Sequence, residues 1–110
     1  MYDMGKYKRG EIYKIYYQNH KGMRLSSEVV VVSPNIYNNE SELTVVVPVV
    51  LFKSHTNAFE VKLDGYGEGG TARADMPRVM PLKEYDAKLV VKLPEEIIDE
   101  ILAKAITLFK

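Results

Sequence analysis

An arginine and an aspartate stand two positions apart in the segment Thr-Ala-Arg-Ala-Asp, residues 71–75. In an extended strand, successive side chains point to opposite faces, so Arg73 and Asp75 share one face with Thr71 while two alanines occupy the other, buried face. Such a pair offers a cation for a phosphate and a carboxylate that can accept a proton. The simpler alternative is a surface ion pair that contributes little stability.

A glycine-rich segment, Gly65-Tyr66-Gly67-Glu68-Gly69-Gly70, precedes this strand. Glycine lets another backbone or a ligand approach closely, and a run of glycines predicts a mobile loop. Pro77 lacks a backbone N–H and is expected to end the strand pairing. The Arg–Asp pair is therefore predicted to follow a glycine loop and to lie near a strand end.

Composition limits the classes of function. The chain has 110 residues, enough for one domain with one modest core. Lys plus Arg number 15 and Asp plus Glu number 15, so any nucleic-acid site must be a local patch. The absence of cysteine excludes disulfides, thiolate catalysis and cysteine zinc sites, and with no leader sequence it predicts a cytoplasmic protein.

No motif predicts a metal, a cofactor or a membrane span. The longest apolar run, residues 45–52, is too short to cross a bilayer and contains Pro48. The two histidines, His20 and His55, lack the spacing of a metal site with nearby carboxylates.

The first half of the chain predicts three strands. Residues 11–17 form the first, and a polar loop over 18–27 follows, which is either an ordinary hairpin loop or a flap over an anion. The β-branched run 29–32 predicts a central strand buried on both faces. Residues 35–42 read as a turn-rich connection, and residues 43–50 as the next strand, with a bulge or an edge at Pro48.

The second half predicts short strands and one helix. After a polar loop over 53–57, residues 58–63 alternate with Phe59, Val61 and Leu63 inward, and residues 79–82 and 88–93 form closing strands. Pro94, two glutamates and a helical apolar stripe then predict an amphipathic helix that docks on the sheet; the stripe is Ile97, Ile98, Ile101, Leu102, Ala105, Leu108 and Phe109. The fold class is mostly β (α+β), a small antiparallel barrel with a C-terminal helix, in a single domain over residues 1–110.

Several motifs occur in an order that resembles a known family. They are Lys8-Arg9-Gly10-Glu11-Ile12-Tyr13, Val29 to Pro34, Thr44-Val45-Val46-Val47-Pro48, Phe59-Glu60-Val61-Lys62-Leu63-Asp64-Gly65, Arg73-Ala74-Asp75-Met76-Pro77-Arg78 and Leu93-Pro94-Glu95-Glu96-Ile97. Together they resemble the MazF/PemK/Kid toxins of bacterial type II toxin–antitoxin pairs, from Lys8 to the end of the chain.

The resemblance implies a CcdB/MazF/Kid-like, SH3-like barrel that forms a homodimer and cleaves single-stranded RNA without a metal or cofactor. It also implies inhibition by an antitoxin whose acidic, flexible tail lies in the RNA groove. RNA supplies its own nucleophile, the 2′-OH, so the enzyme needs a base, a cation and an acid. On this interpretation Asp75 is the base, Arg73 stabilises phosphate charge and assists the leaving group, and His20 contacts phosphate. The products carry a 2′,3′-cyclic phosphate and a 5′-hydroxyl.

The same resemblance proposes Glu11, Arg24, Phe59, Thr71 and Arg78 as RNA-binding residues. Glu11 has either a structural or a hydrogen-bonding role in the site. Phe59 either shapes the RNA groove or belongs to the core. His20 lies in a loop slightly shorter than that of the Kid-like members.

The chain also departs from the family pattern. Many members carry Gly-x-Arg-Pro at the central strand, and Ser27, followed by Glu28, stands where their arginine contributes to catalysis. Val50-Leu51 stands where a hydroxyl residue is common. A carboxylate at Glu28 near a phosphate groove repels RNA, and Arg24 is the nearest cation that could replace the missing one.

These departures leave two other functions open. One is a catalytically degenerate family member that binds an antitoxin as an interaction module. The other is a gyrase poison, because the CcdB toxins share the fold. It ranks last, because that activity depends on an aromatic C-terminal end, whereas this chain has no tryptophan and ends Leu108-Phe109-Lys110.

Overall fold

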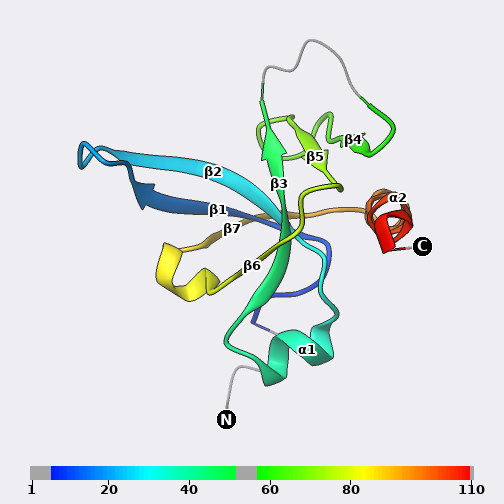
Figure 1. Cartoon of the computed structure of the whole chain (residues 1–110), viewed down its shortest axis with the longest axis horizontal. Coiled ribbons are helices and arrows are strands. Elements are labelled where there is room, and N and C mark those ends of the chain that lie inside the picture. Colours follow the sequence, from blue (N-terminus) through cyan, green and yellow to red (C-terminus); the bar gives the residue numbers. More distant parts are fainter. Residues whose placement is uncertain (1–5, 52–56, 110) are drawn as a thin grey trace.

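The computed structural model describes residues 6–51 and 57–109. In these residues the chain forms a seven-stranded sheet in which every strand pairing is antiparallel (Figure 1). The strands are β1 (Glu11–Gln18), β2 (Arg24–Val31), β3 (Thr44–Val50), β4 (Glu60–Lys62), β5 (Thr71–Arg73), β6 (Arg78–Met80) and β7 (Lys88–Lys92). The helices are α1 (Asn35–Glu40) and α2 (Glu95–Ile106), with 3₁₀ turns η1 (Leu82–Tyr85) and η2 (Thr107–Phe109). The predicted fold class is confirmed.

The sheet follows the order β4-β5-β3-β2-β1-β7, and β6 pairs with the first half of β3. β3 changes neighbour along its length, because Val46 lies opposite Arg78 of β6 whereas Val49 lies opposite Ala72 of β5. Pro48 lies between these two contacts. Proline has no backbone N–H to donate, but at this position the pairing with β6 has ended and the pairing with β5 has not yet begun, so no hydrogen bond between strands is lost there. The predicted irregularity at Pro48 therefore takes the form of a change of partner strand.

Two buried clusters lie on opposite faces of the sheet. β2 and the residue that follows it contribute Val30 and Val32 to one cluster, and β2 contributes Val29 and Val31 to the other, which confirms a central strand buried on both faces. The larger cluster also contains Ile12, Val47, Val49, Val61, Leu63, Ala72, Ala74, Leu93, Ile98 and Ile101, and the smaller contains Tyr13, Ile15, Val46 and Leu82. The face that carries the smaller cluster is called the outer face below.

Helix α2 covers the larger cluster and lies beside β4 (Figure 1). Ile98 and Ile101 are buried, as the apolar stripe predicts, and Lys104 Nζ donates a hydrogen bond to the carbonyl oxygen of Glu60 at 2.9 Å. The last residues of the predicted stripe, Leu108 and Phe109, instead lie exposed in η2. Among the described helices, none is both long and apolar enough to cross a bilayer.

The segment predicted as a turn-rich connection contains helix α1, which the sequence reading missed. Asn38 is buried, and its Nδ2 donates hydrogen bonds to the carbonyl oxygens of Tyr7 at 2.7 Å and Ser33 at 3.1 Å. The asparagine thus joins the chain start to the end of the central strand. Asparagine is typical of turns, and only the tertiary contacts make this one a buried anchor.

Several strand boundaries also differ from prediction: the strand predicted over 58–63 is β4 (Glu60–Lys62), and the one predicted over 79–82 is β6 (Arg78–Met80), with Leu82 in η1. β2 begins at Arg24, opposite Gln18 of β1, so half of the predicted polar loop is a paired strand. β5 ends at Arg73, four residues before Pro77, and Asp75 lies in a turn in which the N–H of Met76 donates to the carbonyl of Arg73 at 3.1 Å. The polar loop predicted for residues 53–57, with His55, lies almost entirely outside the described residues.

Candidate active site

Arg73 and Asp75 form a side-on ion pair at the end of β5. Arg73 Nε donates to Asp75 Oδ1 at 2.9 Å, and Nη2 donates to Oδ2 at 2.9 Å. Each side chain is 22% exposed, so the pair lies between the core and solvent. The hydrogen bond to Asp75 is the main cause that raises the pKa of Arg73, so the guanidinium keeps its charge.

A second carboxylate, that of Glu60 in β4, also lies next to Arg73. Glu60 is opposite Arg73 in the strand register, and its Oε2 lies 3.1 Å from Arg73 Nε. Its side chain is fully buried, and its Oε1 accepts a hydrogen bond from the N–H of Asn57 at 2.8 Å. One cation is therefore held by two carboxylates, and the formal charge of the three groups is negative. This contact orients the guanidinium but also weakens its attraction for phosphate.

The ion pair lies on the outer face of the sheet. Residues that oppose one another across strands point to the same face. The pairing is Glu60 with Arg73, Val50 with Thr71, Val49 with Ala72, and Pro48 with Val29. One step further along the β3–β5 register places Pro48 opposite Arg73, so Arg73 shares a row and a face with Pro48 and Val29.

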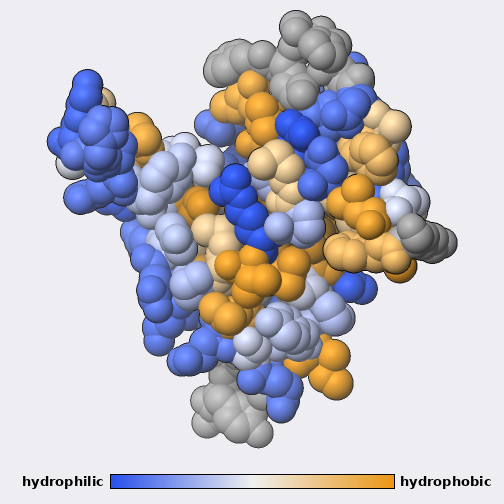
Figure 2. All heavy atoms as spheres, viewed as in Figure 1, coloured by the Kyte–Doolittle hydropathy of each residue, from blue (hydrophilic) through white to orange (hydrophobic). Residues whose placement is uncertain are grey.

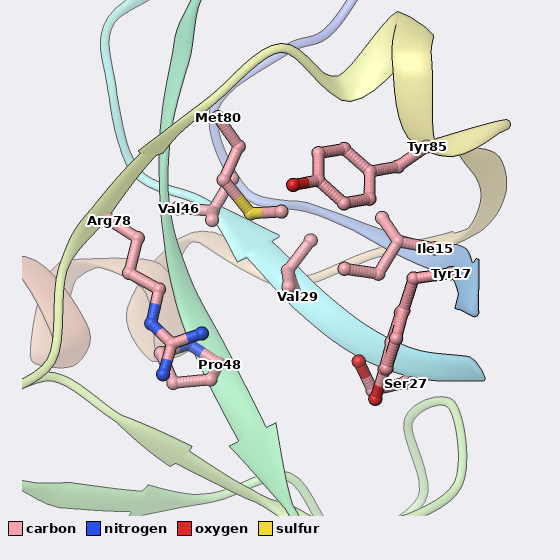
Figure 3. A pocket seen from close by; sticks show the side chains of 9 residues that line it. All are labelled: Ile15, Tyr17, Ser27, Val29, Val46, Pro48, Arg78, Met80 and Tyr85. Atoms are coloured by element: carbon pink, nitrogen blue, oxygen red, sulfur yellow. The ribbon is translucent and has the colours of Figure 1, made fainter. Parts of the chain in front are cut away.

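A cavity of about 360 Å³ opens on this face, with Pro48 at its edge (Figure 3). Its lining is Ile15, Tyr17, Ser27, Val29, Val46, Pro48, Arg78, Met80 and Tyr85. Figure 2 shows the same side of the molecule indented between the β1–β2 hairpin and the part that carries β4 and β5. Arg73 and Asp75 do not line this cavity; they lie one strand beyond it.

The glycine loop closes over Glu28, on the face opposite the cavity. Glu28 is 4% exposed, and its Oε1 accepts a hydrogen bond from the N–H of Glu68 at 3.2 Å. A Cβ atom at Gly67, where φ is +60°, would lie 2.6 Å from this oxygen, and one at Gly70 would lie 2.6 Å from Val49 Cγ1. The predicted close approach at the glycines is confirmed. Glu28 is a buried residue beneath the loop, and not a charge on the cavity face.

Burial raises the pKa of Glu28, and the charge of Glu68 adds to the effect, while the Glu68 N–H and Lys14 oppose it. The pKa of Glu28 is higher in the folded protein than in the unfolded chain. The contribution of Glu28 to the free energy of unfolding is therefore fully present at acid pH, and it is lost as pH rises from about 4.3 through the folded pKa. We expect Glu28→Gln, which keeps the acceptor oxygen, to melt at a higher temperature than wild type near neutral pH. Thermal melts from acid to neutral pH measure the difference, which should shrink toward acid pH. A variant less stable at neutral pH contradicts this assignment.

Two predicted site residues of the first loop, His20 and Arg24, do not join Arg73. His20 is exposed at the tip of the β1–β2 hairpin, which extends away from β5 in Figure 1. Arg24 Nη2 pairs with Asp86 Oδ2 at 3.1 Å, and its guanidinium lies 4.4 Å from the centre of the Tyr16 ring. Arg24 therefore does not replace the missing family arginine in this conformation.

The other four residues predicted to bind RNA lie in different parts of the structure. Glu11 Oε1 accepts hydrogen bonds from the N–H of Lys8 and the hydroxyl of Tyr13, both at 2.8 Å, which favours its structural role. Phe59 is half-buried next to Glu60, and Thr71 is buried in β5. Arg78 lines the cavity.

Sequence reasoning missed Glu60, because Val61 points inward and alternation places its neighbour toward solvent. The available signal was the resemblance motif that contains Glu60, but only the β4–β5 register brings it to Arg73. Within the described residues, no group of three or more His, Asp or Glu side chains could hold a metal ion.

The fold is that of a MazF-type half-barrel. A MazE–MazF crystal structure from Deinococcus radiodurans matches with a TM-score of 0.81 at 21% identity, covering 93% of this chain and 94% of that one. A mycobacterial endoribonuclease in complex with its cognate antitoxin matches with a TM-score of 0.75 at 16% identity, covering 93% of each chain.

Sequence comparison identifies the family. Residues 8–109 match the family described as the PemK-like, MazF-like toxin of type II toxin–antitoxin systems. Endoribonuclease PemK of Escherichia coli is 33% identical over 106 residues, which cover 91% of this chain and 80% of that protein. The chain belongs to the PemK-like, MazF-like toxin family, and the resemblance based on its motifs is confirmed.

Proposed function

We propose that this protein is an endoribonuclease toxin that cleaves single-stranded RNA without a metal and is neutralised by a cognate antitoxin. The Arg73–Asp75 pair on the outer face, in a chain of this family, is the observation that supports the proposal most directly. The E. coli relative named endoribonuclease supports the activity, and the MazE–MazF and mycobacterial complexes support an antitoxin partner.

The proposed reaction forms a P–O2′ bond and breaks the P–O5′ bond. Asp75 takes the proton of the 2′-OH, the 2′-oxygen attacks phosphorus, and Arg73 stabilises the charge that develops on the phosphate. The raised pKa of Arg73 makes it a fixed charge and a poor acid, so the 5′-oxygen takes its proton from water. The products carry a 2′,3′-cyclic phosphate and a 5′-hydroxyl.

The two hydrogen bonds between Arg73 and Asp75 leave capacity for substrate. A guanidinium has five N–H donors, and this pair uses two of them. Glu60 Oε2 lies 3.1 Å from Nε, and this second negative charge helps to keep the guanidinium in place when a phosphate competes with Asp75. The same proposal includes a homodimer and an antitoxin whose acidic tail lies in the RNA groove. It also places the protein in the cytoplasm, where its RNA substrate is.

A second function, a catalytically inactive module that binds an antitoxin, is favoured by the charge balance of the site. Arg73 is shared between two carboxylates, Ser27 stands at the usual arginine position, and Arg24 is paired with Asp86. RNA binding depends on phosphate neutralisation, which this arrangement weakens.

Digestion of end-labelled single-stranded RNA, with and without EDTA, tests the two functions. We expect cleavage in EDTA, 5′-hydroxyl ends that polynucleotide kinase labels directly, and no cleavage where the 2′-OH is replaced by hydrogen. Cleavage that requires a divalent metal, or that proceeds at a 2′-deoxynucleotide, contradicts the mechanism. Tight binding of the antitoxin with no cleavage of any RNA supports the inactive module.

A further inference from the structure

Side chains of β1 and β2 hold the tip of the glycine loop, residues 65–70, on the face opposite the cavity. Glu28 of β2 lies opposite Lys14 of β1 in the strand register. Its Oε1 accepts a hydrogen bond from the N–H of Glu68 at 3.2 Å, and Lys14 Nζ lies 4.0 Å from Glu68 Oε2. Two polar contacts therefore join the loop to these two strands.

The fit between the loop and Glu28 depends on the backbone at Gly67. Gly67 has a φ of +60°, and a Cβ atom there would lie 2.6 Å from Glu28 Oε1 and 2.8 Å from Oε2. Gly69 has a similar φ of +74°, but a Cβ atom there would meet no described atom within 4 Å. The backbone conformation favours glycine at both positions, whereas only at Gly67 does glycine also let the main chain lie against the carboxylate.

The loop leads directly into the strand that carries Arg73. β4 and β5 have three residues each, and the pairing of β5 with β3 covers two positions. A hairpin this short is expected to move unless other contacts hold it. Helix α2 supports the β4 side, where Lys104 donates a hydrogen bond to the carbonyl oxygen of Glu60. Glu28 supports the other end, where the loop enters β5.

We infer that Glu28 is a positioning residue: by holding the glycine loop against β2, it fixes the place of Arg73 and Asp75 relative to the rest of the sheet. The inference rests on the function proposed above. Because neighbouring strands are about 4.8 Å apart, RNA bound at Arg73 also passes over other strands. Its reacting phosphate meets the ion pair only if β5 keeps its place beside them, and a misplacement of about 1 Å can cost about 10²-fold in rate.

A purely structural role fits Glu28 less well. Burial raises the pKa of this carboxyl, so its ionised form lowers stability near neutral pH, and an apolar side chain would fill the same space without that loss. Features that reduce stability occur mainly where a function needs them. In the Gly-x-Arg-Pro pattern, Glu28 stands at the place of the proline, which has no side-chain acceptor. The contact with the loop is therefore a feature of this chain.

A first pair of variants moves the loop without changing Glu28. Gly67→Ala places a methyl group against the carboxylate. We expect it to speed amide hydrogen exchange in residues 66–70 and to lower the single-turnover cleavage rate at saturating RNA by up to about 10²-fold. Gly69→Ala is the matched control, because it has the same kind of backbone strain but open space around its methyl group, and it should cut RNA like wild type.

A second pair changes the acceptor and leaves the loop sequence intact. Glu28→Met keeps the length of the side chain but offers no oxygen to the N–H of Glu68, so it should speed loop exchange and slow cleavage without a large loss of melting temperature. Glu28→Gln keeps the acceptor and should restore both readouts. A merely structural role predicts instead that the cleavage rate follows the melting temperature across the four variants.

The NMR signal of the Arg73 Nε–H group reports on the ion pair without depending on cleavage, because this N–H donates to Asp75 Oδ1 at 2.9 Å and should be protected from exchange. We expect a sharp signal in wild type, Gly69→Ala and Glu28→Gln, and a weak one in Gly67→Ala and Glu28→Met.

The outcomes separate this inference from the proposed function. Wild type that cuts no RNA, with loop exchange and the Arg73 signal changed as expected in the variants, contradicts the nuclease and supports the positioning role. Wild type that cuts RNA, with equal cleavage by Gly67→Ala and Gly69→Ala or with wild-type cleavage by Glu28→Met, overturns the positioning role alone. Unchanged loop exchange in both Gly67→Ala and Glu28→Met also overturns it.

Discussion

Replacement of Asp75 by asparagine is expected to reduce RNA cleavage about 10²- to 10⁴-fold, the usual contribution of a general base. The amide has nearly the same shape but cannot take the proton of the 2′-OH. Asp75 is partly exposed and lies in a surface turn, so the loss of its ion pair with Arg73 should change stability little. Single-turnover cleavage of end-labelled RNA measures the rate, and thermal melting checks the fold.

Asp99→Asn is the matched control, because Asp99 is an exposed aspartate of helix α2 on another part of the molecule. We expect this variant to cut RNA like wild type. Cleavage by Asp75→Asn at a rate close to that of the control would remove Asp75 from the mechanism, even if RNA cleavage itself is established.

Arg73 variants test whether the guanidinium acts through its charge alone. Arg73→Ala removes the charge, and loss of one such stabilising donor usually costs about 10²- to 10³-fold in rate. Arg73→Lys keeps the charge but cannot form the two parallel hydrogen bonds to Asp75. An intermediate rate for lysine is expected if charge stabilisation is the main role. Equal loss in both variants would show that the geometry of the Arg73–Asp75 pair matters as much as the charge.

The sequence predicted most of the elements but only part of the site. The periodicity of α2 and the alternation of the strands depend on local spacing, and the predicted strands and this helix occur in the structure in the predicted order, with shifted ends. Arg73 and Asp75 are two residues apart, so local geometry alone brings them together. Glu60 could not be predicted in the same way, because its contact with Arg73 depends on strand register across a glycine loop.

Buried polar residues account for most of what the sequence reading missed. Asn38 was read as a turn residue and Glu28 as a possible charge near the groove, yet both are buried and hydrogen-bonded. Asparagine and glutamate lie mostly at protein surfaces, so their type alone predicts exposure. Only the tertiary hydrogen bonds show that these two are buried. Ser27, at the position where many family members have an arginine, lines the cavity but supplies no charge there.

Glu60 provides the largest expected effect on stability. Breaking a buried ion pair by removing one partner costs about 3 to 5 kcal/mol when the other charge is left buried. Arg73 is partly exposed and keeps Asp75, so we expect the free energy of unfolding to fall by a smaller amount, about 2 to 3 kcal/mol, in Glu60→Ala. The lost acceptor for the N–H of Asn57 adds to this cost. Chemical denaturation measures the change.

Two further variants isolate the role of the buried charge. Glu100→Ala removes a glutamate of α2 that pairs with Lys104 at 3.0 Å but is largely exposed, so its cost should stay below about 1 kcal/mol. Glu60→Gln keeps an acceptor oxygen for the N–H of Asn57 but removes the charge beside Arg73, and its stability should lie between those of wild type and Glu60→Ala. If Glu60→Ala unfolds like Glu100→Ala, the buried carboxylate contributes nothing to the fold. In that case the contact with Glu60 is not what holds Arg73 in place.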